Sequence, residues 1–91
     1  MTDHTALGAL RAAFEILAPK AATLSPADLT MLQGRVFAAV DEFRASGVLL
    51  ERVIVAIQGL AADAGIQLTG LPLRQRLETW CIERYSVAPP D

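Results

Sequence analysis

The sequence from Val48 to Gly65, VLLERVIVAIQGLAADAG, is the most apolar stretch of the chain and decides the predicted fold. Its apolar residues recur every three or four positions, which places them on one face of a helix. We therefore predict a helix over about residues 48–64 that packs into a helical core. The residues of its core face are Leu50, Val53, Ile54, Ile57, Leu60, Ala61 and Ala64.

The opposite side of this predicted helix is only partly polar. Val48, Val55 and Ala62 recur there at seven-residue spacing, with Gly59 beside them. A helix that is apolar nearly all round is normally buried on both sides. Two interpretations follow: the rest of the chain covers this second stripe, or a second copy of the protein packs against it. Gly and Ala in the stripe would let two helix backbones approach closely.

Three further helices are predicted, each with a local signal at one end. Pro19 ends the first, because proline restricts the preceding residue and lacks an amide hydrogen. Ser25 is a good N-cap for the second, with Pro26 in the first helical position and Asp28 in the first turn. Pro72 begins the last. The four predicted helices span about residues 4–18, 26–46, 48–64 and 72–86, and residues 87–91 are expected to form a frayed tail.

The connection between the second and third helices is short, since Ser46 and Gly47 are nearly all of it. Two long helices joined so closely run antiparallel. We therefore predict an all-α fold in a single domain over residues 1–91. It is a small four-helix bundle with a long central antiparallel helical hairpin, across which the first and last helices pack. The predicted core consists of Leu10, Phe14, Leu17, Leu32, Val36, Val40, Phe43, Leu50, Val53, Ile54, Ile57, Leu60, Leu77 and Trp80.

The composition predicts surplus apolar surface. Of the 91 residues, 53% are apolar, and the mean hydropathy is +0.37. A small domain buries only about 60–68% of its unfolded surface, so a protein partner, first of all another copy of the chain, is expected. The charge-free stretch Val53–Ala62 is far shorter than the roughly 20 residues of a membrane span. The first residues, MTDHTALGAL, contain no positively charged leader. We expect a cytoplasmic protein with no membrane partner.

Charge and motif content disfavour several classes of function. The chain has a formal charge of −2, whereas a nucleic-acid binder usually carries a basic patch on its surface. We therefore expect no nucleic-acid partner. The lone cysteine, Cys81, is far in sequence from His4, the only histidine, and a nucleophile needs a neighbouring base. No cofactor motif or zinc spacing is present. We therefore expect a protein that is not an enzyme and holds no cofactor or metal.

The leading functional hypothesis is a non-enzymatic helical protein-interaction module. It would self-associate as a homodimer or larger, or serve as an accessory subunit of a larger assembly. Ile82 extends the hypothesis to the last helix, because it is another apolar residue in a polar setting. The predicted interface residues are Val48, Val55, Gly59, Ala62 and Ile82.

The alternative hypothesis is a small-ligand or anion-binding regulatory protein that uses Arg74 and Arg76. Both residues lie in the first turn of the predicted last helix, where cations oppose the helix dipole. Two guanidiniums and free helix amides could converge there on an anion. The simpler interpretation is that they pair with carboxylates, for example Arg74 with Glu78 one turn later.

Overall fold

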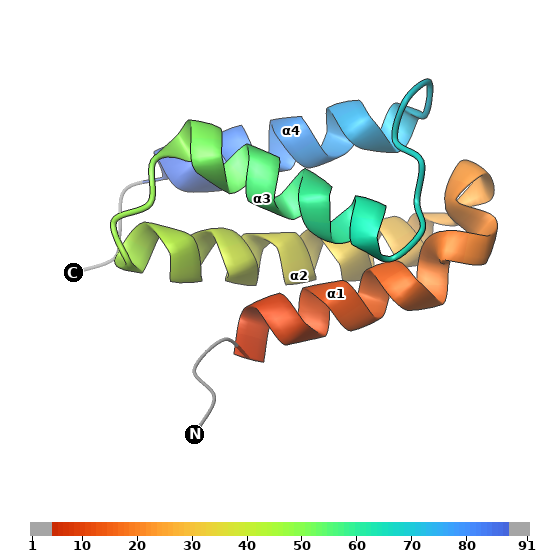
Figure 1. Cartoon of the computed structure of the whole chain (residues 1–91), viewed down its shortest axis with the longest axis horizontal. Coiled ribbons are helices and arrows are strands. Elements are labelled where there is room, and N and C mark those ends of the chain that lie inside the picture. The colour runs from red at the N-terminus through yellow and green to blue at the C-terminus, as the bar shows by residue number, and fades with distance from the viewer. Residues whose placement is uncertain (1–4, 88–91) are drawn as a thin grey trace.

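The computed structural model describes residues 5–87, and within them the chain forms four α-helices and no strand (Figure 1). The predicted all-α helical bundle is therefore confirmed. The predicted helix start at residue 4 and the tail residues 88–91 lie outside the described part of the chain. The elements are α1 (Thr5–Leu17), the 3-10 helix η1 (Ala18–Thr23), α2 (Pro26–Ala45), α3 (Leu50–Asp63) and α4 (Pro72–Ser86).

Helix α2 is the element against which most of the bundle packs. Its main contacts are with α1 and α4, and it meets α3 much less. Helix α3 packs chiefly against α4 and then against α1. Helices α2 and α3 do run in opposite directions on either side of their short connection (Figure 1). The contacts agree with a hairpin of these two helices but do not establish it as the centre of the bundle.

The start of α2 is held by the predicted capping box. The Ser25 hydroxyl oxygen accepts a hydrogen bond from the Asp28 amide at 3.1 Å, and the Asp28 carboxylate accepts one from the Ser25 amide at 3.2 Å. These bonds satisfy amides that have no partner inside the helix. Lys20 also reaches the Asp28 carboxylate at 3.1 Å, so η1 is tied to the first turn of α2.

Helices α2 and α3 each end in a turn with the same pattern of hydrogen bonds. Each has a glycine of positive φ just past its end, Gly47 at 80° and Gly65 at 94°. The next residue then donates its amide to a carbonyl five residues back at 3.0 Å, Val48 to Phe43 after α2 and Ile66 to the equivalent carbonyl after α3. This pattern turns the chain sharply and directs the residue after the glycine back onto the helix. Ile66 is consequently buried, with 3% of its surface exposed.

The core combines one apolar face from each α-helix. Most of the predicted core side chains are fully buried, whereas Phe43, Leu50, Ile54 and Leu60 lie partly buried at its margin. The buried residues also include the small residues Ala13 and Ala39, which were absent from the predicted core. The buried residues are Leu10, Ala13, Phe14, Leu17, Leu32, Val36, Ala39, Val40, Val53, Ile57, Ala61, Ile66, Leu73, Leu77, Trp80 and Cys81.

None of the helices within residues 5–87 combines the length and the apolar character that crossing a bilayer requires.

Candidate functional site

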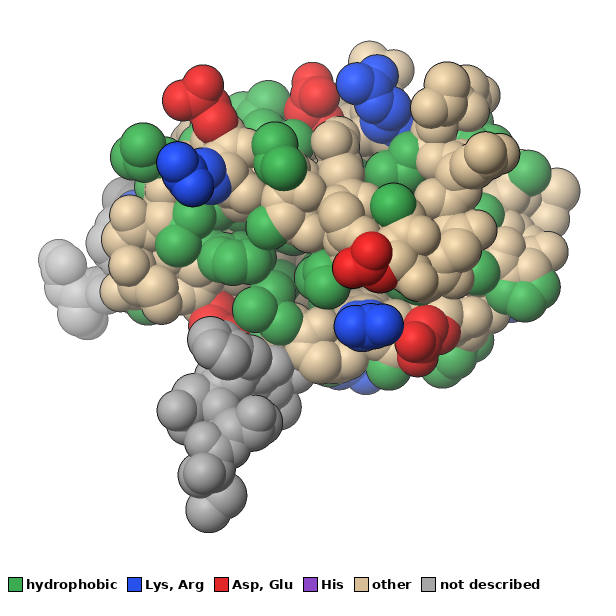
Figure 2. All heavy atoms as spheres, viewed as in Figure 1, with side chains coloured by type: hydrophobic (Ala, Val, Ile, Leu, Met, Phe, Trp, Pro, Cys, Tyr) green, Lys and Arg blue, Asp and Glu red, His purple; other side chains and the backbone are tan. Residues whose placement is uncertain are grey.

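The outward face of α3 is open. Val55 exposes 69% of its surface, and Gly59 and Ala62 are exposed on the same side of the helix. The opposite side carries Val53 and Ile57, which are fully buried. Figure 2 views the molecule from the side of α3 and shows hydrophobic side chains over this helix with acidic and basic ones around them. The chain therefore leaves Val55, Gly59 and Ala62 uncovered.

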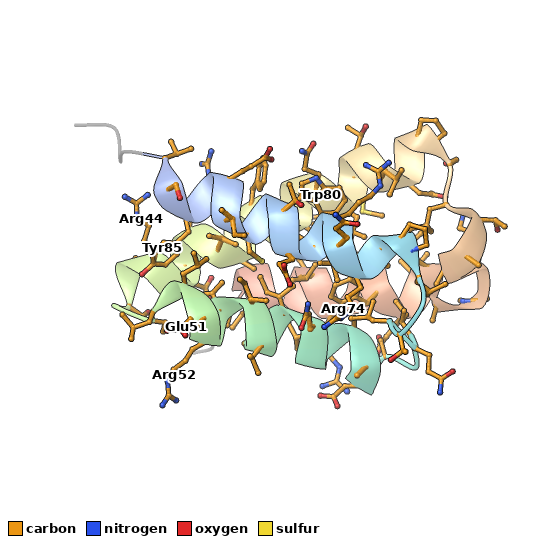
Figure 3. The ribbon with its side chains drawn as sticks, turned by 90° about the horizontal axis from the view of Figure 1, so that it is seen from above. Arg44, Glu51, Arg52, Arg74, Trp80 and Tyr85 are labelled. Carbon is orange, nitrogen blue, oxygen red and sulfur yellow. The ribbon has the colours of Figure 1, made fainter. Side chains whose placement is uncertain are left out.

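Charged residues lie at both ends of this open face. Arg52 and Asp63 are exposed and stand eleven positions apart, which is close to three whole helical turns. They therefore lie along one edge of α3, while Glu51 lies along the other. Figure 3 shows Arg52 extending away from the bundle. None of the three is joined to another described residue by an ion pair or hydrogen bond.

Val48 does not belong to this face, which corrects the prediction. Helix α3 begins at Leu50 rather than at residue 48, and Val48 lies in the turn before it, partly buried against the core. Its amide bonds to the Phe43 carbonyl at 3.0 Å, and its carbonyl accepts a hydrogen bond from the Tyr85 hydroxyl at 2.8 Å. The turn that ends α2 interrupts the helix, so the seven-residue spacing from Val48 to Val55 has no helical meaning.

The other predicted interface residue, Ile82, is exposed but belongs to α4. It keeps 44% of its surface accessible, and it lies opposite the buried side of α4, which is formed by Leu73, Leu77 and Trp80. Ile82 is therefore a separate apolar point on a second helix. The continuous part of the predicted interface is Val55, Gly59 and Ala62.

The structure does not bring Arg74 and Arg76 together. Arg74 is on the side of α4 that faces α3 (Figure 3) and lines a hollow with Gly70 and Glu78. Arg76 lines other hollows, on the side of η1 and α2. Two positions along a helix differ by about 200° in direction, so the two guanidiniums diverge. The ion pairs among the described residues do not include Arg74 with Glu78.

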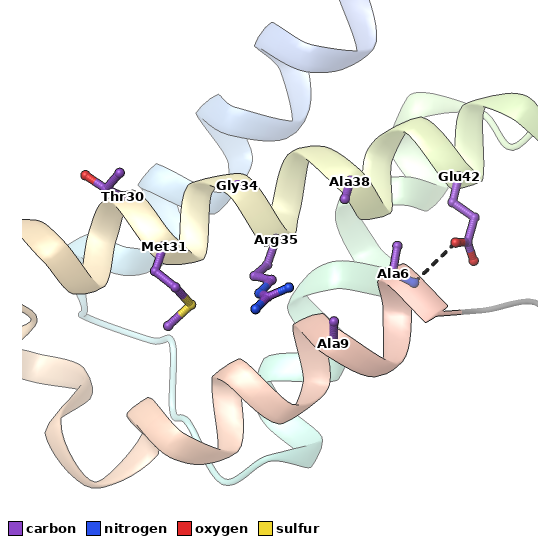
Figure 4. Close-up of a pocket in the computed structure, with 8 residues that line it drawn as sticks. All are labelled: Ala6, Ala9, Thr30, Met31, Gly34, Arg35, Ala38 and Glu42. Atoms are coloured by element: carbon purple, nitrogen blue, oxygen red, sulfur yellow. Dashed lines mark hydrogen bonds between the residues drawn. The ribbon is translucent and has the colours of Figure 1, made fainter.

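A shallow groove between α1 and α2 went unpredicted (Figure 4). Its walls are small residues, Ala6 and Ala9 from α1 and Gly34 and Ala38 from α2, and Arg35 lies between them. The Ala6 amide donates to the Glu42 carboxylate at 3.4 Å and joins the two helices at one end of the groove. The feature of the sequence that could have indicated this groove is the pair of small residues Gly34 and Ala38, four positions apart in α2.

A group of polar contacts at the other side of α2 fixes the end of α4. Arg84 pairs with Asp41 through two hydrogen bonds of 2.8 Å and lies 5.5 Å from the centre of the Phe37 ring. Arg44 lies 5.9 Å from the Tyr85 ring centre and donates to the Val87 carbonyl. The charged side chains of α2 and α4 thus hold the two helices together. The contact with Arg44 also explains why Tyr85 is half-buried.

Cys81 is a core residue. It is fully buried, and burial raises the pKa of its thiol to about 12, with a further contribution from the negative charge of Glu78. A thiol in that state is a poor nucleophile. Within residues 5–87, no group of three or more His, Cys, Asp or Glu side chains is arranged to hold a metal ion. His4 lies outside the described residues.

In comparisons with known proteins, no family model, no curated protein sequence and no solved structure matches this chain.

Proposed function

We propose that this protein is a non-enzymatic helical interaction module that associates through the outward face of α3, with further copies of itself or as an accessory subunit of a larger assembly. The observation that carries the proposal is the exposed Val55 above the open positions Gly59 and Ala62. Leu49, the residue that precedes α3, is also 63% exposed. Apolar side chains gathered on one element mark contact surfaces more often than scattered ones do.

The shape of this face suits another helix. A Cβ atom placed on Gly59 would meet nothing within 4 Å, so the middle of the face is an open strip of backbone. Glycine and alanine at a helix crossing permit a short distance between the two axes, which brings more atoms into contact. Helix α3 has 14 residues, which corresponds to a length of about 21 Å and nearly four turns available to a partner helix.

The size of the face sets the expected affinity. A contact confined to one helix of this length belongs at the small end of protein interfaces. We therefore expect a dissociation constant on the order of micromolar to tens of micromolar. Association of this strength is measurable at the concentrations used for sedimentation and is easily reversed on dilution.

Sedimentation equilibrium over a range of protein concentrations tests the proposal. We expect the average mass of the wild-type chain to rise above that of the monomer as the concentration increases. Val55→Glu and Ala62→Glu should each hold the mass at the monomer, because each places a charge in the apolar contact. Ile16→Glu is the matched control, since Ile16 is 67% exposed on α1. Unchanged masses for Val55→Glu and Ala62→Glu would rule out this face.

The anion-binding alternative gains no support from the arrangement of α4. Arg74 and Arg76 line different hollows, so a single small anion has no common site between them. The remaining argument for an anion at this helix would be its N-terminal amides alone, and such amides are present in every helix. We therefore favour the interaction hypothesis.

A further inference from the structure

We propose that the partner of α3 is the α3 helix of a second copy of this chain, packed antiparallel, with Arg52 of each copy beside Asp63 of the other. The inference rests on the proposed function, because it names the occupant of the same face. It adds the orientation of the two helices and the charged residues that pair in it.

The apolar positions of the face fit a two-fold arrangement. In an antiparallel pair of identical helices, positions equally distant from the symmetry axis face each other. The midpoint between Val55 and Ala62 falls between positions 58 and 59, beside Gly59. An axis at this point sets Val55 of one copy against Ala62 of the other and leaves Gly59 at the crossing. Each Val55 then packs against the smaller Ala62 of the other copy, and the two backbones cross at Gly59, which has no side chain.

The charged positions fit the same axis. The midpoint between Arg52 and Asp63 falls between positions 57 and 58, one residue from the midpoint of the apolar pair. An axis beside Gly59 sets Arg52 opposite position 65, two residues or about 3.0 Å along the helix from Asp63, and a long arginine side chain spans that distance. Both residues lie on one edge of α3, and a two-fold axis across the helices keeps that edge on the same side in both copies. Arg52 of each copy therefore reaches Asp63 of the other.

The charges also distinguish this arrangement from the parallel one. Two parallel α3 helices related by a two-fold axis would set this edge of one copy beside the opposite edge of the other, so Arg52 would lie toward Glu51 and not toward Asp63. Only the antiparallel pair brings Arg52 of each copy beside Asp63 of the other, which gives two equivalent attractions. Neither Arg52 nor Asp63 has a partner within the described part of its own chain, so each remains available to a second copy.

Charge reversal tests the pairing in the full chain. Arg52→Asp and Asp63→Arg should each weaken self-association about tenfold, because two exposed attractions become two repulsions. The double variant restores both attractions with the charges exchanged, so its dissociation constant should return toward that of the wild type. Single variants that dimerise like the wild type, or a double variant that stays as weak as the single ones, would overturn the inference.

Disulfide cross-linking tests the orientation independently. A mixture of the Val55→Cys and Ala62→Cys variants should form a disulfide between the two different chains under mild oxidation. Each variant alone should cross-link far less, since equivalent positions lie apart in an antiparallel pair. The native Cys81 is buried and does not compete. Efficient cross-linking of Val55→Cys with itself would indicate parallel helices and overturn the inference.

The outcomes separate this inference from the proposed function. A wild-type chain that remains monomeric throughout the sedimentation series defeats the homodimer. A dimer whose mass is unaffected by Val55→Glu refutes the use of the α3 face, and the proposed function falls with the inference. If Val55→Glu dissociates the dimer but the charge reversals leave it unchanged, the proposed function stands and only the antiparallel pairing is refuted.

Discussion

Arg84 and Asp41 join α4 to α2 through two parallel hydrogen bonds, from Nε to Oδ1 and from Nη2 to Oδ2, each 2.8 Å long. The hydrogen bond from Arg84 is the main cause that lowers the pKa of Asp41 below its usual value. The pKa of Asp28 is also lowered, chiefly by its hydrogen bond with the Ser25 amide and then by Lys20. The folded state therefore favours the ionised form of both carboxyl groups more than the unfolded state does.

This relationship predicts a loss of stability in acid. The folded-state pKa of each carboxyl group lies below the unfolded value, which is about 3.9 for Asp. Their stabilisation is then complete above about pH 5 and is lost as the pH falls through the folded-state pKa values. We expect the melting temperature to fall on acidification below about pH 4, as measured by circular dichroism.

The Asp41→Asn variant should show less of this acid dependence and a lower melting temperature at neutral pH. Glu83→Gln is a suitable control, because Glu83 is exposed on α4 and makes no ion pair with another described residue. Equal acid dependence in the wild type and the Asp41→Asn variant would show that this pair does not contribute.

Two apolar residues of α1 should respond very differently to truncation. Phe14 is fully buried, so Phe14→Ala leaves a cavity and should lower the free energy of unfolding by about 3–5 kcal/mol. That is a large part of the stability of a small domain. Ile16 is 67% exposed, and Ile16→Ala should change the free energy of unfolding by less than about 0.5 kcal/mol. Urea denaturation of both variants measures the contrast, and similar losses would contradict the packing of α1.

Cys81 should be protected from thiol reagents in the folded protein. Its pKa of about 12 leaves almost no thiolate at neutral pH, and its burial denies access to the reagent. We expect slow reaction of the native chain with Ellman's reagent and rapid reaction of one thiol per chain in denaturant. The Phe14→Ala variant should react faster than the wild type, because it opens more often. Rapid labelling of the native wild-type chain would contradict this core position.

The helix ends could be predicted where local chemistry sets them. Ser25 and Pro72 mark helix starts through capping and a fixed φ, and Gly47 marks a stop through its positive φ. Val48 shows the limit of periodicity. The turn after Gly47 separates it from α3, but its spacing from Val55 continues unbroken in the sequence. An apolar repeat therefore extended the predicted helix, and the predicted interface, through a turn.

The long-range contacts had no signal of this kind. Asp41 and Arg84 are 43 positions apart, and their pairing depends on how α4 settles on α2. Arg74 and Arg76 are close in sequence, but they line different hollows because of the way α4 packs against its neighbours. The exposed strip of Val55, Gly59 and Ala62 was visible because it lies within a single helix, where spacing alone determines which residues share a face.

Gly59→Ala and Gly34→Ala should have the same effect on the stability of the monomer but different effects on self-association. Both lie inside helices, and a Cβ atom at either would meet nothing within 4 Å. In the monomer, each substitution should raise the free energy of unfolding by up to about 1 kcal/mol, because alanine favours helix more than glycine does. Thermal unfolding at low protein concentration measures this common effect.

At high protein concentration the two variants should differ. If α3 crosses a second α3 at Gly59, the methyl groups of Gly59→Ala separate the backbones and weaken the dimer, whereas Gly34→Ala, on α2, leaves it unchanged. Sedimentation equilibrium of both variants measures the difference. A Gly59→Ala variant that associates as strongly as Gly34→Ala would mean that glycine at this position serves no close approach, and the contact would then have to be centred elsewhere on α3.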